Sequence, residues 1–137
     1  MRLTMHAAEG IGLAAPQIGQ SFKLAVIEFL PHEGEDGAAD PQPPIPFFAI
    51  INPTITQMNG DWQVYDEGCL SIPELQTPVA RATEVSVLTD TLDGRRIRIR
   101  AKGLLARILQ HEIDHLNGVL IVDRTSDKKI KKQYATS

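Results

Sequence analysis

Residues 103–117 read GLLARILQHEIDHLN, and this stretch carries the strongest helix pattern in the chain. Its apolar side chains recur at the spacing of one helix face, and Gly118 directly after it is a typical C-terminal stop. The pattern predicts a partly buried helix against which the rest of the chain packs. The apolar positions on it are Leu104, Leu105, Ile108, Leu109, Ile113 and Leu116.

The same helix contains the sequence His111-Glu112-Ile113-Asp114-His115. Positions i and i+4 lie one turn apart on the same face, so the two imidazoles can point at one divalent metal ion. Glu112 can then reach a water on that ion and take its proton as the water attacks a carbonyl group. The alternative is a set of solvated residues. The apolar face before them argues for burial, where two histidines and a glutamate without a partner would be costly.

A catalytic metal site needs a third protein ligand and one open coordination position. No histidine or glutamate follows His115, so the third ligand is expected upstream, among His6, His32, Cys69 and the acidic residues. Cys69 is the best candidate, because a thiolate is a strong ligand for a borderline ion and because a flanking glycine and proline fix its backbone. Taken alone, a single cysteine is more often a small buried hydrophobic residue.

Strand-like stretches precede the helix. Residues 22–30 (FKLAVIEFL) and 47–52 are typical of buried strands, and the second is expected to stop at Asn52-Pro53. Residues 10–21 and 31–46 are rich in glycine or proline and are interpreted as loops.

Two turn signals predict hairpins. Asn59-Gly60 lies between residues 54–58 and 62–65, and Asp93-Gly94 lies between residues 84–92 and 95–100, which alternate in polarity. Residues 119–122 are expected to form a last short strand. Six or seven strands arranged as hairpins, with one long helix, predict an α+β fold in which antiparallel sheets pack around a central metal-binding helix.

The composition is that of a single ordinary domain over residues 1–137. Hydrophobic residues make up 42% and charged residues 23%, which is enough apolar material for a core. Fourteen Lys+Arg against 17 Asp+Glu give a net charge of −3, a poor balance for a dedicated nucleic-acid-binding protein. One cysteine excludes an intramolecular disulfide framework. With no membrane-spanning run and no signal-peptide pattern, we expect a cytoplasmic location, where the thiol stays reduced.

Residues 10–17 (GIGLAAPQ) form a third element of interest. Their paired glycines allow another backbone or a substrate to approach closely. Gln17 is the one polar side chain in this run, and its amide could donate to a developing oxyanion. The alternative is a packing turn with an exposed glutamine. A phosphate-binding loop is disfavoured, because the Lys-Ser/Thr pair and a preceding strand are both lacking.

Together, residues 10–17, 67–71 and 110–118 resemble the three signature motifs of the peptide deformylases, in the order in which that family has them. The resemblance runs from about Ala8 to Thr125. It implies Glu112 as general acid and base, with Gln17 and the backbone N–H of Leu70 stabilising the tetrahedral oxyanion. The metal ligands that it implies are Cys69, His111 and His115.

The family resemblance also implies the reaction. Deformylases hydrolyse the formyl group from N-formyl-methionyl nascent chains, usually with Fe2+, for which Zn2+, Ni2+ or Co2+ can substitute. Ile11, Gly12 and Gly68 match positions at which the family docks its peptide substrate as an added strand. Ile11 and Ile108 are expected to wall the pocket for the methionine side chain.

Two departures from the family pattern bear on activity. Relatives usually begin a few dozen residues earlier, whereas only residues 1–9 precede the first motif here, so we expect either a naturally short chain or a fragment. Where many relatives place a substrate-holding arginine, this chain has Gln76 or a neighbour. Two alternatives therefore stay open: a zincin-like metallopeptidase with another third ligand, and an inactive truncated relative.

Residues 124–137 are basic. Five basic residues stand against one acid, Asp127. A solvated helix face is the simpler interpretation, and a weak contact with ribosomal RNA is the functional one. We expect no membrane partner and no specific DNA binding. The expected source is a bacterial cytoplasm, with an organelle or a virus as the alternatives. The basic residues are Arg124, Lys128, Lys129, Lys131 and Lys132.

Overall fold

The computed structural model describes residues 12–15, 23–29, 44–69 and 72–129. Within them, five strands form one sheet in the order β1-β2-β3-β4-β5, and every neighbouring pair is antiparallel. The prediction of a mixed fold with antiparallel strands is confirmed, as one sheet rather than several. The strands are β1 Gly12–Ala14, β2 Leu24–Phe29, β3 Ile45–Cys69, β4 Ile72–Asp90 and β5 Arg96–Lys102.

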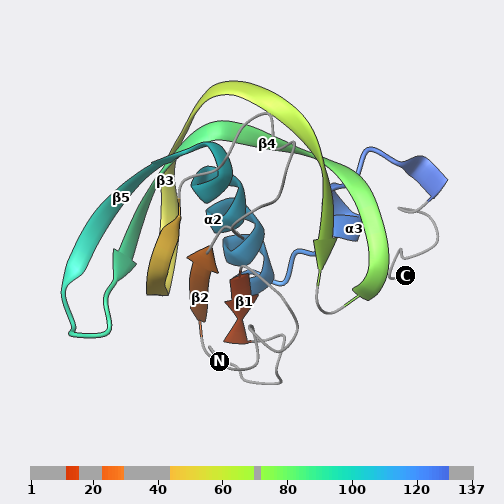
Figure 1. Cartoon of the computed structure of the whole chain (residues 1–137). Helices are drawn as coiled ribbons and strands as arrows, with labels where there is room; N and C mark the ends of the chain where they lie inside the picture. The colour runs from red at the N-terminus through yellow and green to blue at the C-terminus, as the bar shows by residue number, and fades with distance from the viewer. Residues whose placement is uncertain (1–11, 16–22, 30–43, 70–71, 130–137) are drawn as a thin grey trace.

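Helix α2, Gly103–Leu116, runs beneath the arch that β3 and β4 make over it (Figure 1). Its predicted extent is confirmed to within one residue. The C-terminal end is closed as expected, because Gly118 takes a left-handed φ of +77° and its N–H donates to the carbonyl of His115 at 3.1 Å. Buried side chains of α2 pack against the inner faces of the strands. This core includes Ala106, Leu109, Ile113, Val85, Val87, Ile27 and Ile50.

Strand β3 continues through two places where the sequence predicts an interruption. Its pairing with β4 shifts register between Ile51 and Thr54 and again between Asn59 and Trp62. The predicted strand stop at residues 52–53 and the predicted hairpin at residues 59–60 are therefore wrong. Both sites are irregularities within one long strand, with a positive φ at Asn52 and at Gly60. Bulges bend a strand and increase its twist, which suits a strand that curves over a helix.

The predicted hairpin at Asp93-Gly94 is confirmed. It joins β4 to β5, with Gly94 at a φ of +84° and its N–H donating to the carbonyl of Thr91 at 3.0 Å. Residues 12–14, expected in a loop, form strand β1, and β3 begins at Ile45, inside the expected proline-rich loop. Most of both predicted loops lies outside the described residues.

The expected last strand at residues 119–122 is wrong. The short helix α3, Ile121–Arg124, stands there instead, and its Ile121 and Val122 pack against Val79 of β4. Thr125, directly after α3, makes the one β-type contact of this segment, an isolated bridge to Val79. Within the described ranges, no helix is long and apolar enough to cross a membrane.

Gln110 ties α2 to the sheet. Strand β5 accompanies β4 only as far as the pair Glu84–Lys102, so Ala82 lies beyond its reach. The buried Gln110 side chain stands in for a strand there: its Oε1 accepts from the N–H of Ala82 at 3.0 Å, and its Nε2 donates to the carbonyl of Ala82 at 2.8 Å. Both backbone groups of a buried residue are thereby satisfied.

We expect Gln110→Met to lower the free energy of unfolding by about 2–4 kcal/mol, because it leaves two buried backbone groups of Ala82 without partners. Denaturant unfolding measures the change. The matched control is Gln57→Met on the exposed surface of β3, expected within about 0.5 kcal/mol of the parent chain. Equal effects of the two substitutions would contradict the role given to Gln110.

Candidate active site

The two histidines of α2 face each other. His111 and His115 stand one turn apart, and their Nε2 atoms lie 3.1 Å from each other, with ring planes inclined by 66°. The i, i+4 spacing thus brings both ring nitrogens to one point, as the sequence predicts. Two nitrogens bound to one tetrahedral ion at about 2.0–2.1 Å would lie about 3.3 Å apart, so the observed spacing fits a shared cation.

The other ring nitrogen of His111 is held by a carboxylate. Its Nδ1 lies 2.9 Å from Oε1 of Glu67, a residue of β3 that is 6% exposed. An ionised carboxylate can only accept, so Nδ1–H is the donor, and in the neutral form of the ring the lone pair lies on Nε2, on the side of His115. A carboxylate behind an imidazole is the usual support of a metal-binding histidine. The donor set therefore fits a divalent transition-metal ion.

Arg81 of β4 lies behind Glu67. Its Nε–H and Nη2–H donate to the two carboxylate oxygens of Glu67 at 3.0 and 2.9 Å, and its Nη1–H donates to Oδ2 of Asp114 at 2.6 Å. Arg81 is 3% exposed, so these charge-assisted bonds form where water does not compete. One guanidinium thereby connects both long strands to the helix that carries the histidines.

Asp114 has a second cationic partner. Arg124 of α3 donates from Nη2 to Oδ1 at 3.1 Å and from Nε to Oδ2 at 3.2 Å, while half of its side chain remains exposed. Two carboxylates and two guanidiniums thus alternate in a series of hydrogen bonds that runs from the imidazole of His111 to the surface. The formal charges of the four groups cancel. A buried charge cluster is tolerated when its members are paired in this way.

The ion pairs fix the charge states. Burial alone would raise the pKa of Glu67, but the hydrogen bonds and positive charges of His111 and Arg81 outweigh it and lower that pKa from 4.5 to about 2. Burial would lower the pKa of Arg81, and its bonds to Glu67 and Asp114 raise that pKa instead. Both groups therefore stay ionised at neutral pH, and Glu67 stays an acceptor for His111.

Glu112 lies beside the histidine pair. It is 3% exposed, and its Oε1 is 3.9 Å from Nε2 of His111. The carboxylate rests against the backbone of Gly12 in β1, where an added β-carbon would lie only 2.8 Å from Oε1. The expected close approach at Gly12 is therefore an approach to Glu112, and a larger side chain there would displace the carboxylate.

The other residues singled out in the sequence are placed only in part. Cys69 ends β3, two residues beyond Glu67, but its side chain lies outside the described residues, as do Ile11, Gln17, Leu70, His6 and His32. Among the side chains that the structure describes, no group of three His, Cys, Asp or Glu is arranged to hold an ion. The two histidines supply two ligands of such a site, and the third stays a prediction.

Gly68 and Ile108 have clear local roles. A β-carbon on Gly68 would lie 2.5 Å from the amide nitrogen of Gln76, so the side chain of Gln76 covers this backbone. Ile108 is 5% exposed and belongs to the main core cluster. Substrate contacts at these two positions remain predictions.

The sequence reasoning missed Glu67 as the partner of His111, and it missed Arg81, Asp114 and Arg124 as parts of the site. One signal was available for Asp114, because an acid on the buried face of a helix needs a partner. Arg81 stands between the apolar Ala80 and Ala82, a pattern that also indicates burial. Their pairing joins positions 33 residues apart, and no local pattern specifies such a partner.

We expect stability to fall as the pH drops from 4.5 toward 2. Folding favours ionised Glu67, so its contribution, about 3 kcal/mol at most, is complete above pH 4.5 and lost below pH 2. Denaturant titrations across this range measure the slope. Glu67→Gln should flatten it, whereas Asp61→Asn on exposed β3 should leave it as in the parent chain. A Glu67→Gln chain with the parent slope would refute this origin of acid sensitivity.

The chain is similar to known peptide deformylases. The family model for polypeptide deformylase matches residues 1–131. A peptide deformylase of Roseiflexus castenholzii is 50% identical over 135 residues, which cover 96% of this chain and 73% of the relative. A peptide deformylase of Dictyoglomus thermophilum is 44% identical over 130 residues, covering 95% of this chain and 75% of the relative.

Solved structures of peptide deformylases are also similar to this chain. The peptide deformylase of Synechococcus elongatus in complex with actinonin has a TM-score of 0.80 at 43% identity and covers 97% of this chain, which spans 65% of that protein. An Acinetobacter baumannii peptide deformylase with Met-Ala-Ser bound has a TM-score of 0.81 at 36% identity, over 90% of this chain and 76% of its own. The resemblance found in the sequence is confirmed, and the chain belongs to the polypeptide deformylase family of enzymes.

Proposed function

We propose that the chain is a metal-dependent hydrolase that removes the formyl group from the N-terminal formyl-methionine of newly made polypeptides. One observation carries the proposal: two imidazole Nε2 atoms lie 3.1 Å apart, and the ring of His111 is fixed by the buried carboxylate of Glu67. This arrangement supports a metal site, on a chain whose relatives are deformylases.

His111, His115 and Cys69 would hold the ion. When bound, a divalent cation supplies Lewis acidity, which makes water a nucleophile near neutral pH and polarises a carbonyl group. Three protein ligands leave one position open, and an anionic sulfur reduces the effective charge of the ion. Fe2+ is the proposed metal, with Zn2+, Ni2+ or Co2+ as substitutes. An iron–thiolate site should be sensitive to oxygen, with Cys69 as one point of damage.

Glu112 is the proposed proton carrier. Its buried carboxylate lies beside the histidine pair, so it can accept a proton from the attacking water and return it to the departing amine. Water and the formamide bond are consumed, and formate and a free α-amino group are produced. The contact with Gly12 holds the carboxylate in place. The oxyanion would be stabilised by the amide of Gln17 and the backbone N–H of Leu70.

The proposed substrates are N-formyl-methionyl peptides. A formyl carbon carries only hydrogen beside its oxygen and nitrogen, so a narrow site admits it and excludes bulkier acyl groups. The relative from Acinetobacter baumannii with Met-Ala-Ser bound supports a short methionyl peptide as ligand. Docking as an added strand would use Ile11, Gly12 and Gly68, with Ile108 near the methionine side chain. Such substrates arise during protein synthesis, so we propose action in a bacterial-type cytoplasm, within a single catalytic domain.

A weak ribosome contact through residues 124–137 remains part of the proposal, with fewer basic residues available for it. Arg124 is committed to Asp114 and is not a free surface charge. Lys128 and Lys129 are exposed and could meet phosphate groups.

Glu112→Gln should strongly reduce turnover and keep the metal. We expect formate release from formyl-Met-Ala-Ser, measured anaerobically on the Fe2+ or Ni2+ form, to fall by about 10²–10⁴-fold. Metal content, measured by elemental analysis, should be unchanged. Glu84→Gln, a carboxylate paired with Lys102 on the sheet, is the control and should retain turnover. Surviving turnover in Glu112→Gln would remove Glu112 from the mechanism, and no formate release from the parent chain would refute the proposed function.

Cys69→Ala should weaken metal binding. A ligand lost from a three-ligand site should reduce affinity in chelator competition by at least about tenfold. The control is Asp61→Asn, which should bind metal as the parent does. A peptidase-type site with another third ligand would retain its metal in Cys69→Ala, so unchanged affinity would contradict the assigned ligand set.

A further inference from the structure

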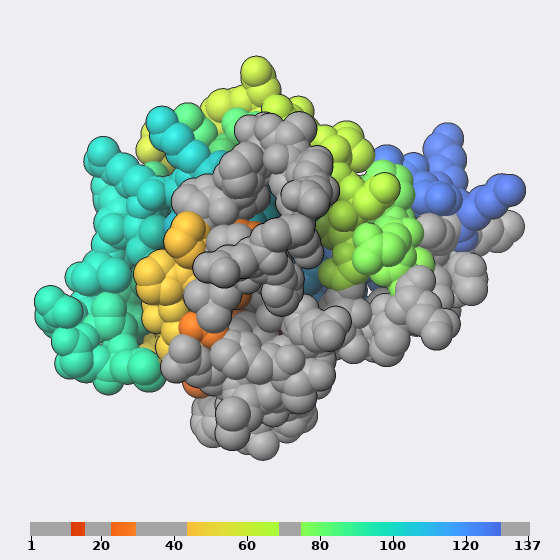
Figure 2. All heavy atoms as spheres, in the orientation of Figure 1, coloured from red at the N-terminus to blue at the C-terminus, as the bar shows by residue number. Residues whose placement is uncertain are grey.

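Strand β5 lies at one edge of the sheet. It pairs with β4 from Arg96 to Lys102, and no other described strand lies on its outer side (Figure 1). Every second residue of such a strand turns a backbone N–H and C=O outward. In Figure 2 the β4–β5 hairpin forms the left-hand margin of the molecule.

The charged side chains of β5 are all basic. Four basic residues stand at alternate positions, so they share one face at intervals of about 6.6–6.8 Å. They are Arg96, Arg98, Arg100 and Lys102, all exposed.

The two ends of this row have acidic partners and the middle does not. Arg96 pairs with Asp90 at 3.0 Å, and Lys102 pairs with Glu84 at 3.5 Å. Within the described part of the chain, the two central arginines have no carboxylate partner. They lie across from Leu88 and Ser86 of β4.

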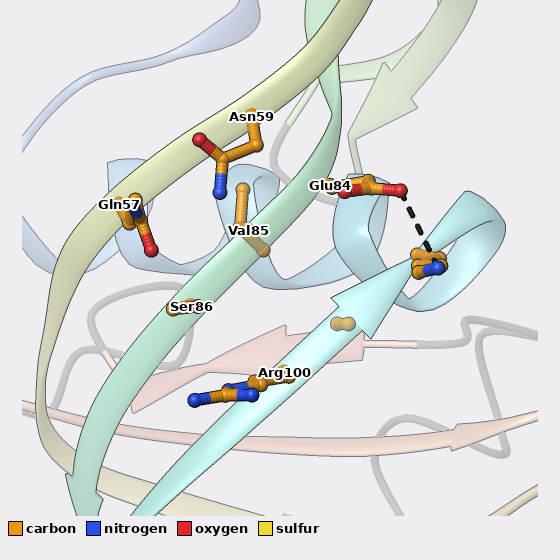
Figure 3. A pocket seen from close by; sticks show the side chains of 8 residues that line it. Gln57, Asn59, Glu84, Val85, Ser86 and Arg100 are labelled. Carbon is orange, nitrogen blue, oxygen red and sulfur yellow. Dashed lines mark ion pairs between the residues drawn. The ribbon is translucent and has the colours of Figure 1, made fainter.

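The opposite face of β5 is apolar at its outer end. Ile97 is 38% exposed, whereas Ile99 is half-buried and Ala101 is buried in the core. The basic face instead continues into a polar pocket of about 340 Å³ beside Arg100 (Figure 3). Side chains from three strands line it, among them Gln57, Asn59, Glu84, Ser86 and Lys102.

We propose that β5 docks an extended segment of a partner protein as a sixth strand, with acidic residues at alternate positions and aliphatic residues between them. Main-chain hydrogen bonds to the open edge would supply affinity. A strand in register would place its acidic side chains about 4.5–5.5 Å, at the β-carbons, from the arginines and its aliphatic ones against Ile97.

The row of charges also selects against other occupants. A second copy of β5 would set arginine against arginine, and like charges directly opposite each other destabilise a strand pair. A nucleic acid would engage the charges alone and use neither the backbone edge nor Ile97. The observations therefore favour an acidic strand, and the proposal is independent of the hydrolase activity.

The test uses the full chain and a fluorescein-labelled ten-residue peptide of alternating Glu and Val. We expect saturable binding in fluorescence anisotropy that weakens with added salt. Arg98→Glu with Arg100→Glu should weaken it at least tenfold, and the double variant should instead bind a peptide of alternating Lys and Val. Lys128→Glu with Lys129→Glu changes the net charge equally at another exposed site and should bind as the parent does. Circular dichroism confirms folding of each variant.

Backbone pairing is tested with two N-methylated peptides. Methyl groups on alternate nitrogens in one register should abolish binding, and in the other register should leave it, since only every second N–H faces β5. Equal binding of both peptides, or of a scrambled peptide of the same composition, would overturn strand docking. So would tighter binding of oligouridylate through the same arginines, which would identify a general polyanion surface. Absence of peptide binding at millimolar concentration would also overturn it.

Discussion

The guanidinium of Arg81 is the constraint on which the surrounding structure depends. It is buried between the carboxylates of Glu67 and Asp114, which come from β3 and α2, while Arg81 itself comes from β4. Removing Arg81 would take the guanidinium partner from the buried carboxylate of Glu67, and breaking a buried ion pair typically costs about 3–5 kcal/mol. The bonds of Arg81 to Glu67 and Asp114 hold α2 in place against both long strands. That fixed placement is also what brings His111 to Glu67 and sets its tautomer.

The curvature of the two long strands makes this convergence possible. A straight 25-residue strand would span about 80 Å and could not keep both ends near one helix. Asn59-Gly60 has the local chemistry of a hairpin turn, and the sequence pattern gave no reason to expect anything else. Tertiary context decided the outcome, because pairing with β4 continues on both sides of Gly60. Asp93-Gly94 has the same chemistry and does turn, since no partner strand continues beyond it. Local residue types predict left-handed backbone, while long-range pairing decides between a turn and a bulge.

The site residues also divide into those that local sequence predicts and those that long-range packing decides. The i, i+4 histidines and Glu112 could be predicted because helical geometry alone brings them together. The partners behind them could not, because Glu67, Arg81 and Arg124 reach α2 from three different elements. Burial patterns indicate that a charged residue needs a partner, but not which one. Gly12 is intermediate: its small size was recognised as permitting close approach, whereas the group that approaches it, Glu112, follows only from the packing of β1 against α2.

The position at which β5 ends and α2 begins decides how the edges of β4 and β5 are covered. Because β5 ends at Lys102, the remaining half of β4 needs other partners, and Gln110, Thr125 and Ser126 supply them at Ala82, Val79 and Pro78. These contacts cover the edge of β4 next to the histidines. Another strand at this edge would occupy the space of the ion pairs between Arg81, Asp114 and Arg124. The edge of β5 lies away from these ion pairs and bears a row of three arginines and a lysine, and no other strand of the described part of the chain pairs with it. Charge is a common protection for an open edge, and it restricts pairing to strands of opposite charge. The end of β5 at Lys102 therefore has two consequences. The part of β4 near the histidines is paired by residues of α2 and the segment after α3, whereas the outer edge of β5 stays open to strands of opposite charge.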